Sequence, residues 1–214
     1  MGECIIVSAG DFTPEDLHKE KDDILIAADN GLQYLDAMGY APDYIIGDYD
    51  SLDEKEQAGL DAFRERCPDR ERTLPKAKDD TDTMAAVRWG FDLGYTRFRL
   101  YGALGGRRVD HTIANLQTLM FIQSRGGFGR ILDARQEVFL VREGSYAFEP
   151  GREGLFSVFA VDPKITLTVR GALFEGEDID ITYDFPIGCS NEFLRDRGAF
   201  VRVLGGTALL VAAR

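Results

Sequence analysis

The chain has 214 residues, of which 44% are hydrophobic and 29% are charged, values that are ordinary for a globular protein with a full core. Its formal net charge of −12 opposes binding to nucleic acid, since no cluster of Lys and Arg is dense enough to form a basic patch. The three scattered cysteines form no CxxC motif and no long apolar segment occurs, so we expect a reducing, cytoplasmic environment without a zinc site, a signal peptide or a membrane span.

The first part of the chain alternates between predicted strands and predicted helices. Apolar runs that end in glycine or polar residues predict buried parallel strands over 4–10, 23–31, 44–51, 97–104 and 129–135. Apolar residues at helical spacing, and capping signals, predict helices over 13–20, a short stretch ending at Gly39, 53–67, 81–95 and 110–127.

Two of these helices carry further signals. Thr13 would be the N-cap of the first helix and Pro14 its first helical residue. In the last helix, Ile113, Leu116 and Met120 lie on one face, and glycines follow its end.

The pattern changes near Gln136. From there the sequence has only short apolar runs broken by turns, and Gly205-Gly206 predicts a hairpin between the last two runs. We therefore expect an α/β plus all-β protein: a Rossmann-like α/β domain with a mostly parallel sheet over residues 1–135, and a β-sandwich over residues 136–214.

Two carboxylates follow the predicted strand that ends in Gly47-Asp48-Tyr49-Asp50. In an extended strand, residues i and i+2 point the same way about 7 Å apart at Cα, so Asp48 and Asp50 would face one crevice at the carboxyl edge of the sheet. Close carboxylates repel each other unless a cation lies between them, and Mg²⁺ prefers such ligands together with substrate phosphates. The alternative is a solvated turn, in which Asp and Ser are common.

Acidic and hydroxyl residues crowd the start of the helix predicted over 81–95. Asp79, Asp80, Thr81 and Asp82 follow Lys78 directly. Capping a helix uses one or two such residues, so capping explains only part of this density. A metal site with a nearby cation for phosphate would explain the rest.

A glycine-rich turn lies between the strand over 97–104 and the last helix. Its glycines would let backbone amides approach an anion, and Arg107 and Arg108 can fork onto phosphate oxygens. The turn matches neither the P-loop nor the GxGxxG fingerprint. His111 is either an ordinary helix-start residue or a functional one.

Three further segments are weaker candidates. The segments SAGD (8–11) and ADNG (28–31) end strands at the same sheet edge, where they would line the crevice or simply form strand-to-helix turns. The segment GCSNEF (188–193) has the composition of a turn.

Taken together, GDYDS, KDDTDT, GALGGRRVDHTIANL and SNEF, in this order and spacing, resemble the thiamine pyrophosphokinase (thiamine diphosphokinase) family, and ADNG is similar to its ADGG-type segment. The resemblance covers nearly the whole chain and agrees with the α/β-then-β layout. It implies Mg²⁺-dependent transfer of a pyrophosphoryl group from ATP to the hydroxyethyl group of thiamine, giving thiamine diphosphate and AMP. It also implies a homodimer that holds thiamine between subunits.

The resemblance assigns a role to each matching residue. It implies metal ligands at Asp48, Asp50 and Asp82, which are also catalytic together with Arg108. It implies contacts to ATP from Asp29, Lys78, Thr81 and Arg107, and contacts to thiamine from Asp110, His111, Ser190 and Asn191. Arg108, rather than Arg107, keeps the family's spacing of one residue before the Asp-His pair, and Asn30 stands where glycine is commoner in the family.

Three other functions remain open. A pyrophosphokinase for another alcohol, such as a pterin, would use the same phosphate machinery. A sugar-nucleotide transferase would also hold a metal-bound diphosphate with a DxD pair, but it would leave KDDTD and GGRRVDH unexplained. A non-catalytic nucleotide sensor would bind ATP without releasing AMP, whereas three acids aimed at one crevice favour catalysis.

Overall fold

The computed structural model describes residues 2–12, 17–49, 54–75, 79–106 and 108–214. The chain divides into two compact units, Met1–Asp133 and Ala134–Arg214. The boundary expected between residues 135 and 136 lies in the same short connection, between β6 (Phe128–Leu132) and β7 (Gln136–Ala147). None of the helices in the described ranges is long and apolar enough to cross a membrane.

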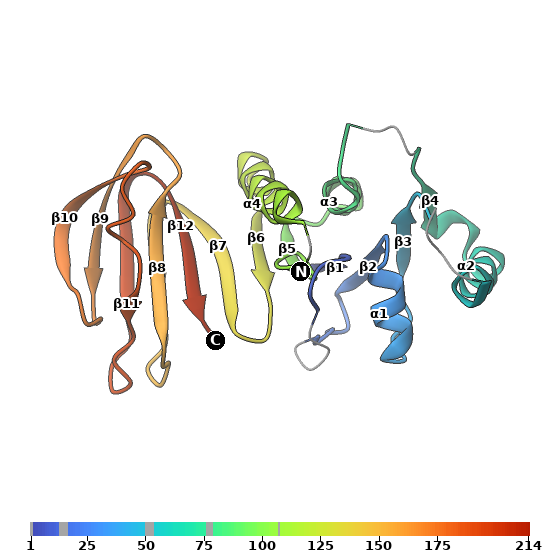
Figure 1. The fold of residues 1–214 in the computed structure, drawn as a ribbon, viewed down its shortest axis with the longest axis horizontal. Helices are drawn as coiled ribbons and strands as arrows, with labels where there is room; N and C mark the ends of the chain where they lie inside the picture. Colours follow the sequence, from blue (N-terminus) through green and yellow to red (C-terminus); the bar gives the residue numbers. More distant parts are fainter. Residues whose placement is uncertain (1, 13–16, 50–53, 76–78, 107) are drawn as a thin grey trace. The chain divides into compact units, whose positions relative to one another are not determined.

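The N-terminal unit is a parallel sheet with helices on both faces (Figure 1). Besides β6, its strands are β1 (Cys4–Val7), β2 (Ile24–Ala28), β3 (Tyr44–Gly47), β4 (Glu71–Thr73) and β5 (Arg97–Tyr101). They lie in the order β6-β5-β1-β2-β3-β4. Its helices are α1 (Gly31–Ala37), α2 (Glu54–Arg66), α3 (Asp82–Asp92) and α4 (Val109–Ser124), with a 3₁₀ turn η2 (Pro68–Arg70). β1 pairs with β2 on one side and with β5 on the other, so the strand order reverses at β1. Such a reversal is where open parallel sheets bind ligands.

Alternate residues of β1 pack against different helices. Ile5 and Val7 belong to one buried cluster with Leu35 of α1. Cys4 points the other way, toward α3, where a Cβ at Gly90 would lie 2.8 Å from the Cys4 sulfur. Because successive side chains of a strand point to opposite faces, α1 and α3 cover opposite faces of the sheet.

The segment before β2 corrects one prediction, because residues 17–20 are not helical; residues 13–16 lie outside the described ranges. Leu17 is buried, and its carbonyl oxygen accepts a hydrogen bond from the Tyr40 hydroxyl at 3.3 Å. The Asp23 carboxylate accepts one from the backbone N–H of Glu20 at 3.0 Å. These tertiary contacts outweigh local helix propensity, since short isolated helices are marginal in water.

Helix α4 turns inward a different side from the apolar face that holds Ile113, Leu116 and Met120. Ile113 and Met120 are 54% and 37% exposed. The buried residues of α4 are instead Asn115, Thr118, Leu119 and Ile122. The amide of Asn115 donates a hydrogen bond to the carbonyl oxygen of Ala103 at 2.8 Å, so the inward side of the helix combines apolar packing with a polar contact to the glycine-rich turn.

The C-terminal unit is built from strands only, as predicted. Besides β7, it contains β8 (Leu155–Ala160), β9 (Lys164–Arg170), β10 (Gly176–Thr182), β11 (Asn191–Glu192) and β12 (Phe200–Ala213). These strands pair with one another in antiparallel fashion. β12 pairs with β7 on one edge, and on the other edge with β9 and then with β8. Its two sheets therefore share β7 and β12, consistent with a β-sandwich.

The predicted hairpin at Gly205-Gly206 is wrong, because β12 runs through both glycines as one strand. The pairing register shifts between Val203 and Thr207, and Gly206 has a φ of +84°. Glycines inside a strand often mark such a bulge, where the strand bends. Here the bend coincides with the change of partner from β9 to β8.

Aromatic rings fill the core of the C-terminal unit. Phe156 and Phe193 stack with their ring centres 4.7 Å apart, and Phe148 meets Phe193 edge-on at 4.9 Å. All three are buried, and each such side chain stabilises the fold by roughly 1.5–3 kcal/mol relative to exposure. Phe193, the last residue of the SNEF segment, is therefore a core residue.

Candidate active site

A cavity of about 450 Å³ lies at the carboxyl edge of the parallel sheet, beside the strand reversal at β1. Its walls come from five segments of the N-terminal unit: residues 8–10 after β1, 28–30 after β2, 81–83 at the start of α3, 102–106 after β5, and the first turns of α4. Segments far apart in the sequence therefore meet at the edge where the motifs were expected to converge.

The floor of this cavity needs glycine. The chain beyond β1 stays paired with the chain beyond β5, since Ser8 N–H donates to the Tyr101 carbonyl at 2.8 Å and Gly10 N–H to the Gly102 carbonyl at 2.7 Å. Gly102 has a φ of +60°, and a Cβ there would lie 2.2 Å from the Ser8 carbonyl oxygen. Only glycine combines this conformation with so close an approach of two backbones.

The start of α3 forms the acidic wall. Thr81 is the N-cap, and its hydroxyl accepts a hydrogen bond from the backbone N–H of Met84 at 3.2 Å. Asp82 follows in the first turn and lines the cavity. Thr83 is buried, and its hydroxyl lies 2.8 Å from the hydroxyl of Ser8. Capping thus accounts for Thr81, as expected for part of this segment, and Asp82 complements the helix dipole while it also lines the cavity.

The start of α4 forms the cationic wall. The N-cap residue, Arg108, makes no side-chain capping hydrogen bond, and the positive end of the helix dipole lies at the cavity, where it favours an anion. Arg108 and His111 line the cavity. Arg108 also pairs with Asp110, with Nη2 and Oδ2 2.5 Å apart, and this hydrogen bond lowers the pKa of the Asp110 carboxyl.

The pKa of Tyr49 is affected by carboxylates on neighbouring segments. Burial raises the pKa of the Tyr49 hydroxyl, Glu71, Asp82 and Asp29 raise it further, and Arg64 lowers it. Within the described ranges, this buried hydroxyl has no hydrogen-bond partner. Carboxylates on three separate segments therefore raise the pKa of this one hydroxyl.

The geometry expected for Asp48 and Asp50 needs correction. Strand β3 ends at Gly47, and Tyr49 has a left-handed φ of +54°, so the chain turns instead of extending through the two acids. Asp48 is partly buried, whereas Asp50 lies outside the described ranges. Among the described residues, no group of three acidic, His or Cys side chains is arranged to hold a metal ion.

The structure brings five of the predicted site residues to one cavity: Asp29, Thr81, Asp82, Arg108 and His111. Lys78 and Arg107, like Asp50, lie outside the described ranges. The sequence did not predict the pairing of Ser8 with Thr83, since the two lie 75 residues apart. The only signal for it was that SAGD and TDT both end or begin elements at the same sheet edge.

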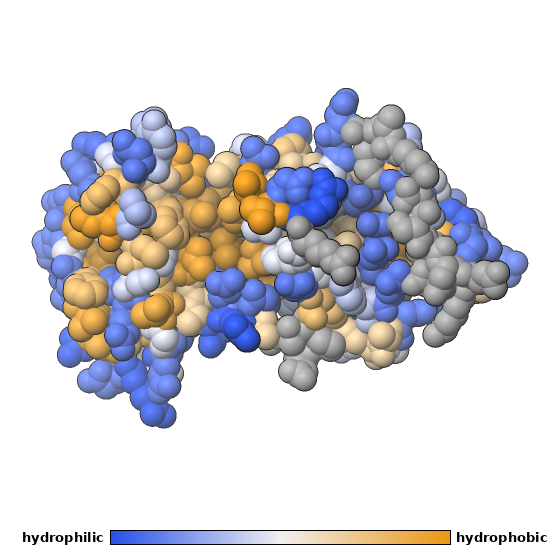
Figure 2. Space-filling view, viewed as in Figure 1, coloured by the Kyte–Doolittle hydropathy of each residue, from blue (hydrophilic) through white to orange (hydrophobic). Residues whose placement is uncertain are grey.

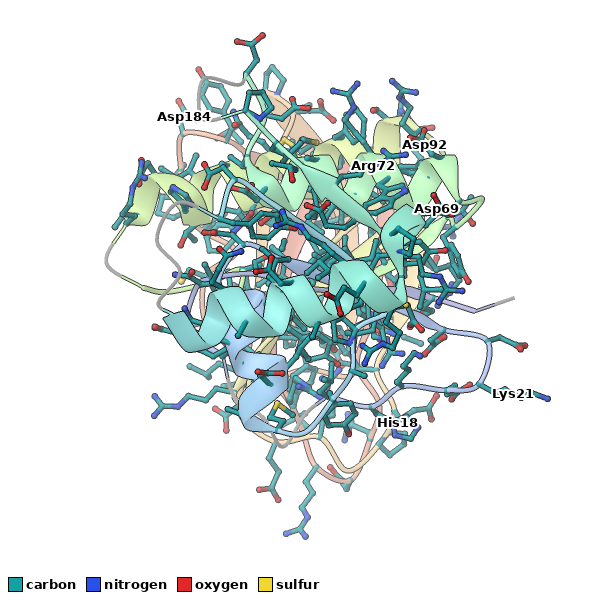
Figure 3. All side chains as sticks on the ribbon, turned by 90° about the vertical axis from the view of Figure 1, so that its right-hand side faces the viewer. His18, Lys21, Asp69, Arg72, Asp92 and Asp184 are labelled. Atoms are coloured by element: carbon teal, nitrogen blue, oxygen red, sulfur yellow. The ribbon has the colours of Figure 1, made fainter. Side chains whose placement is uncertain are left out.

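The second histidine lies elsewhere. His18 is exposed in the loop before β2, and Figure 3 shows it projecting near Lys21, away from Asp69, Arg72 and Asp92. Of the two histidines in the chain, His111 alone lines the cavity.

The remaining predicted residues, Ser190 and Asn191, belong to the C-terminal unit. The Asn191 side chain brackets the backbone of Phe174: its Oδ1 accepts from the Phe174 N–H at 3.0 Å, and its Nδ2 donates to the Phe174 carbonyl at 2.8 Å. One Nδ2 hydrogen is left for another acceptor. Ser190 has a left-handed φ of +62°, and its N–H donates to the Ser157 hydroxyl at 3.0 Å.

Cys189 should react with alkylating agents at lower pH than an ordinary thiol. Hydrogen bonds with the hydroxyls of Ser190 at 3.5 Å and Ser157 at 3.8 Å lower the pKa of its thiol. The reactive thiolate is therefore present at a lower pH than usual. We expect the midpoint of the rate-against-pH curve for iodoacetamide, followed by peptide mass spectrometry, to lie below the usual thiol value of about 8.5.

Replacing Ser157 with alanine supplies the comparison, because it removes one of the two hydroxyls. That variant should move the midpoint upward, toward the ordinary value. An unchanged midpoint in Ser157→Ala, or an ordinary one in the wild type, would contradict the assignment. Buried Cys4, whose thiol pKa is raised by burial, should stay unmodified.

Comparison with known proteins identifies what this arrangement is similar to. A family model described as "Thiamin pyrophosphokinase, catalytic domain" matches residues 16–126, about half of the chain. A curated relative, "Thiamine pyrophosphokinase" of Bacillus subtilis (strain 168), is 27% identical over 178 residues, which cover 82% of this chain and 80% of that protein.

Solved structures share the fold. A thiamine pyrophosphokinase from Bacillus subtilis superposes with a TM-score of 0.86 at 23% identity, over 99% of both chains. A thiamin pyrophosphokinase from Geobacillus thermodenitrificans gives 0.82 at 22% identity, over 100% of this chain and 98% of that one. At these identities the structures establish the α/β-plus-β-sandwich fold, and the match to the family model carries the relationship.

Proposed function

This chain belongs to the thiamine pyrophosphokinase family, a family of transferases that make thiamine diphosphate, and from that premise we propose how its own residues act. In the proposed reaction, the hydroxyl oxygen of thiamine attacks the β-phosphorus of ATP. The bond from that phosphorus to the oxygen bridging the α-phosphorus breaks, AMP leaves with the bridging oxygen, and the proton of the thiamine hydroxyl is released to solvent. Chemistry of this kind depends on positioning and charge stabilisation more than on covalent help from the protein.

The observation that carries the proposal is the cavity at the strand reversal, with an acidic wall at Asp82 and a cationic wall at Arg108. A triphosphate held by a cation needs both signs of charge within one site. The start of α4 and the guanidinium of Arg108 are suited to the anionic oxygens, and the Gly105–Gly106 turn lets backbone approach them.

The donor groups of the acidic wall fit Mg²⁺. Asp29 and Asp82 offer carboxylate oxygens, the hard ligands that Mg²⁺ prefers, and Asp48 follows the neighbouring strand. We propose Asp48, Asp50 and Asp82 as the residues that would hold the ion. When bound, Mg²⁺ would neutralise charge on the phosphates, which offsets the repulsion between ATP and a protein of net charge −12.

We assign the other residues to the two substrates. Asp29, Lys78, Thr81 and Arg107 are proposed to contact ATP, and Arg108 to stabilise the charge of the transferred group. Asp110, His111, Ser190 and Asn191 are proposed to contact thiamine, which makes the N-terminal unit the ATP- and Mg²⁺-binding domain and the C-terminal unit the thiamine-binding domain. Two observations support these roles: Arg108 and His111 line the cavity, and the Asn191 amide retains one hydrogen.

We also propose a cytoplasmic homodimer that binds neither nucleic acid nor membrane. All three cysteines are free, as in a reducing compartment, and the net charge is strongly negative. Apolar side chains stand exposed on both units, including the α4 stripe formed by Val109, Ile113 and Met120. Figure 2 shows apolar residues gathered on the visible face of the C-terminal unit. Phe174 and Phe185 are among the exposed apolar residues of this unit.

If the α4 stripe is part of the dimer interface, Ile113→Glu should weaken dimerisation. Ile113 is 54% exposed in the isolated chain, so a charge there costs the monomer little, whereas burial of an unpaired carboxylate at an interface is costly. Light scattering over a concentration series should show dissociation of the variant at concentrations where the wild type stays dimeric. Ala58→Glu, at an exposed position of α2 and so outside the stripe, is the control, and a dimeric Ile113→Glu would rule out the stripe.

The direct test of the function is AMP release from ATP and Mg²⁺, with and without thiamine, with the product identified by mass. Thiamine-dependent AMP together with thiamine diphosphate is the expected result. ATP binding without thiamine-dependent AMP would reject this acceptor and direct the search to pterins and other alcohols. Binding without AMP release for every alcohol would indicate a nucleotide sensor instead.

A further inference from the structure

We infer that the Ser8–Thr83 hydroxyl pair positions Asp82 for the metal–nucleotide complex by fastening the first turn of α3 to the end of β1. This inference rests on the proposed function only for the role of Asp82. The two residues are positioning residues, since they act through Asp82.

The bond between the two side chains joins the central strand to a helix. Ser8 Oγ and Thr83 Oγ1 lie 2.8 Å apart, and both residues are buried, at 5% and 6% exposure. Ser8 is itself fixed, because its backbone N–H donates to the Tyr101 carbonyl at 2.8 Å. The start of α3 is therefore tied, through Ser8, to two adjacent strands, β1 and β5.

Asp82 lies between two fixed threonines. On one side, the Thr81 hydroxyl accepts from Met84 N–H and closes the first turn of α3. On the other side, Thr83 is held by Ser8. The backbone that carries the Asp82 carboxylate is thus held at both neighbouring residues, which limits the positions that this carboxylate can take in the cavity.

Stability alone does not require this pair. Replacing both partners of a buried hydrogen bond by apolar groups of the same shape can be nearly neutral, so Val and Ala would fill the space as well. Both hydroxyl residues also line the cavity instead of lying elsewhere in the core. A site that must hold a carboxylate within a fraction of an ångström of a metal gains from such a tether, because partners behind metal ligands tune affinity.

The experiment compares Thr83→Val, which keeps the shape but removes the hydroxyl, with Thr83→Ser, which keeps the hydroxyl. Calorimetry measures Mg²⁺ affinity in the presence of α,β-methylene-ATP, and turnover measures the Mg²⁺ half-saturation and the KM for thiamine. We expect Thr83→Val to weaken Mg²⁺ affinity about tenfold, as loss of a supporting contact typically does. The KM for thiamine should change less than about twofold, because the substitution removes no contact to thiamine. Ser8→Ala should behave like Thr83→Val, and Thr83→Ser should restore the affinity.

Thr118→Val is the matched control. Thr118 is a fully buried threonine on α4 whose hydroxyl donates to the Ala114 carbonyl at 3.0 Å, and it is not among the residues that line the cavity. The same chemical change there should leave Mg²⁺ affinity unchanged, even if the melting temperature falls. All binding is measured well below the melting temperature of each variant.

The outcomes separate this inference from the proposed function. Wild-type Mg²⁺ affinity in Thr83→Val, or an equal loss in Thr118→Val, would overturn the positioning role while thiamine diphosphate synthesis stands. A wild type that makes no thiamine diphosphate, with Mg²⁺–nucleotide binding that still depends on Thr83, would support the positioning role and reject the acceptor. A wild type that binds no Mg²⁺–nucleotide would overturn both.

Discussion

Asp82→Asn should lower turnover by about a hundred- to a thousandfold, the loss typical of removing one group that stabilises charge in a transition state. The substitution keeps the shape of the side chain but removes the negative charge from the first turn of α3, where Asp82 lines the cavity. Steady-state AMP release at saturating ATP and thiamine measures the loss. The fold should survive, because losing a helix-dipole contact costs about 0.3–1 kcal/mol.

Asp92→Asn is the matched control, since Asp92 lies at the other end of α3. It is exposed and pairs with Arg72 at 3.5 Å on the outer surface, as Figure 3 shows (Asp92 and Arg72 labelled). Its turnover should match the wild type. Asp50→Asn should lose activity as Asp82→Asn does, and near-normal turnover in both variants would refute the metal assignment.

Arg99→Met should destabilise the N-terminal unit by about 3–5 kcal/mol, the usual result of removing one partner of a buried ion pair. Arg99 lies in β5 with its side chain 11% exposed, and it contacts Asp23 at 2.5 Å and Glu3 at 2.6 Å. The Asp23 side chain is only 4% exposed, so its charge would be left buried without this partner. Methionine keeps the apolar stem, which confines the change to the charge. Urea unfolding followed by circular dichroism gives the difference in free energy.

Arg97→Met tests whether burial is the cause. Arg97 lies two residues away on the same strand and contacts the same Glu3 at 3.0 Å, but its side chain is 49% exposed. Exposed ion pairs contribute about 0–1 kcal/mol, so this variant should unfold close to the wild type. Similar losses in the two variants would show that burial does not set the strength of these contacts.

The elements of the N-terminal unit could be predicted from sequence where local and tertiary preferences agree. Helices α2 and α3 form where apolar spacing and capping residues predict them, and Thr81 caps α3 through its own side chain. Strands β1, β2 and β5 form within the predicted apolar runs, since both faces of a parallel strand are buried. Agreement between local signals and packing made these elements predictable.

The predictions failed where long-range contacts decide the structure. Leu17 packs in the buried core and accepts a hydrogen bond from Tyr40, and it is not part of the helix that was predicted over 13–20. Two glycines inside β12 mark a bulge, because the strand changes partner there, and a local pattern does not distinguish a bulge from a hairpin. The Ser8–Thr83 hydrogen bond could not be predicted for the same reason, because it joins residues 75 positions apart. Each residue nevertheless lies in a segment that was predicted at the correct edge of the sheet.

Strand β12 has a consequence for how the chain is made. It is the last strand in the sequence, yet it pairs with β7, β8 and β9. These earlier strands therefore cannot complete their pairing until β12 has been synthesised. The parallel sheet of the N-terminal unit has all its strands once β6 has left the ribosome. Vectorial translation therefore lets the N-terminal unit fold first, while the sandwich, with its pairings between distant segments, completes only after β12 emerges.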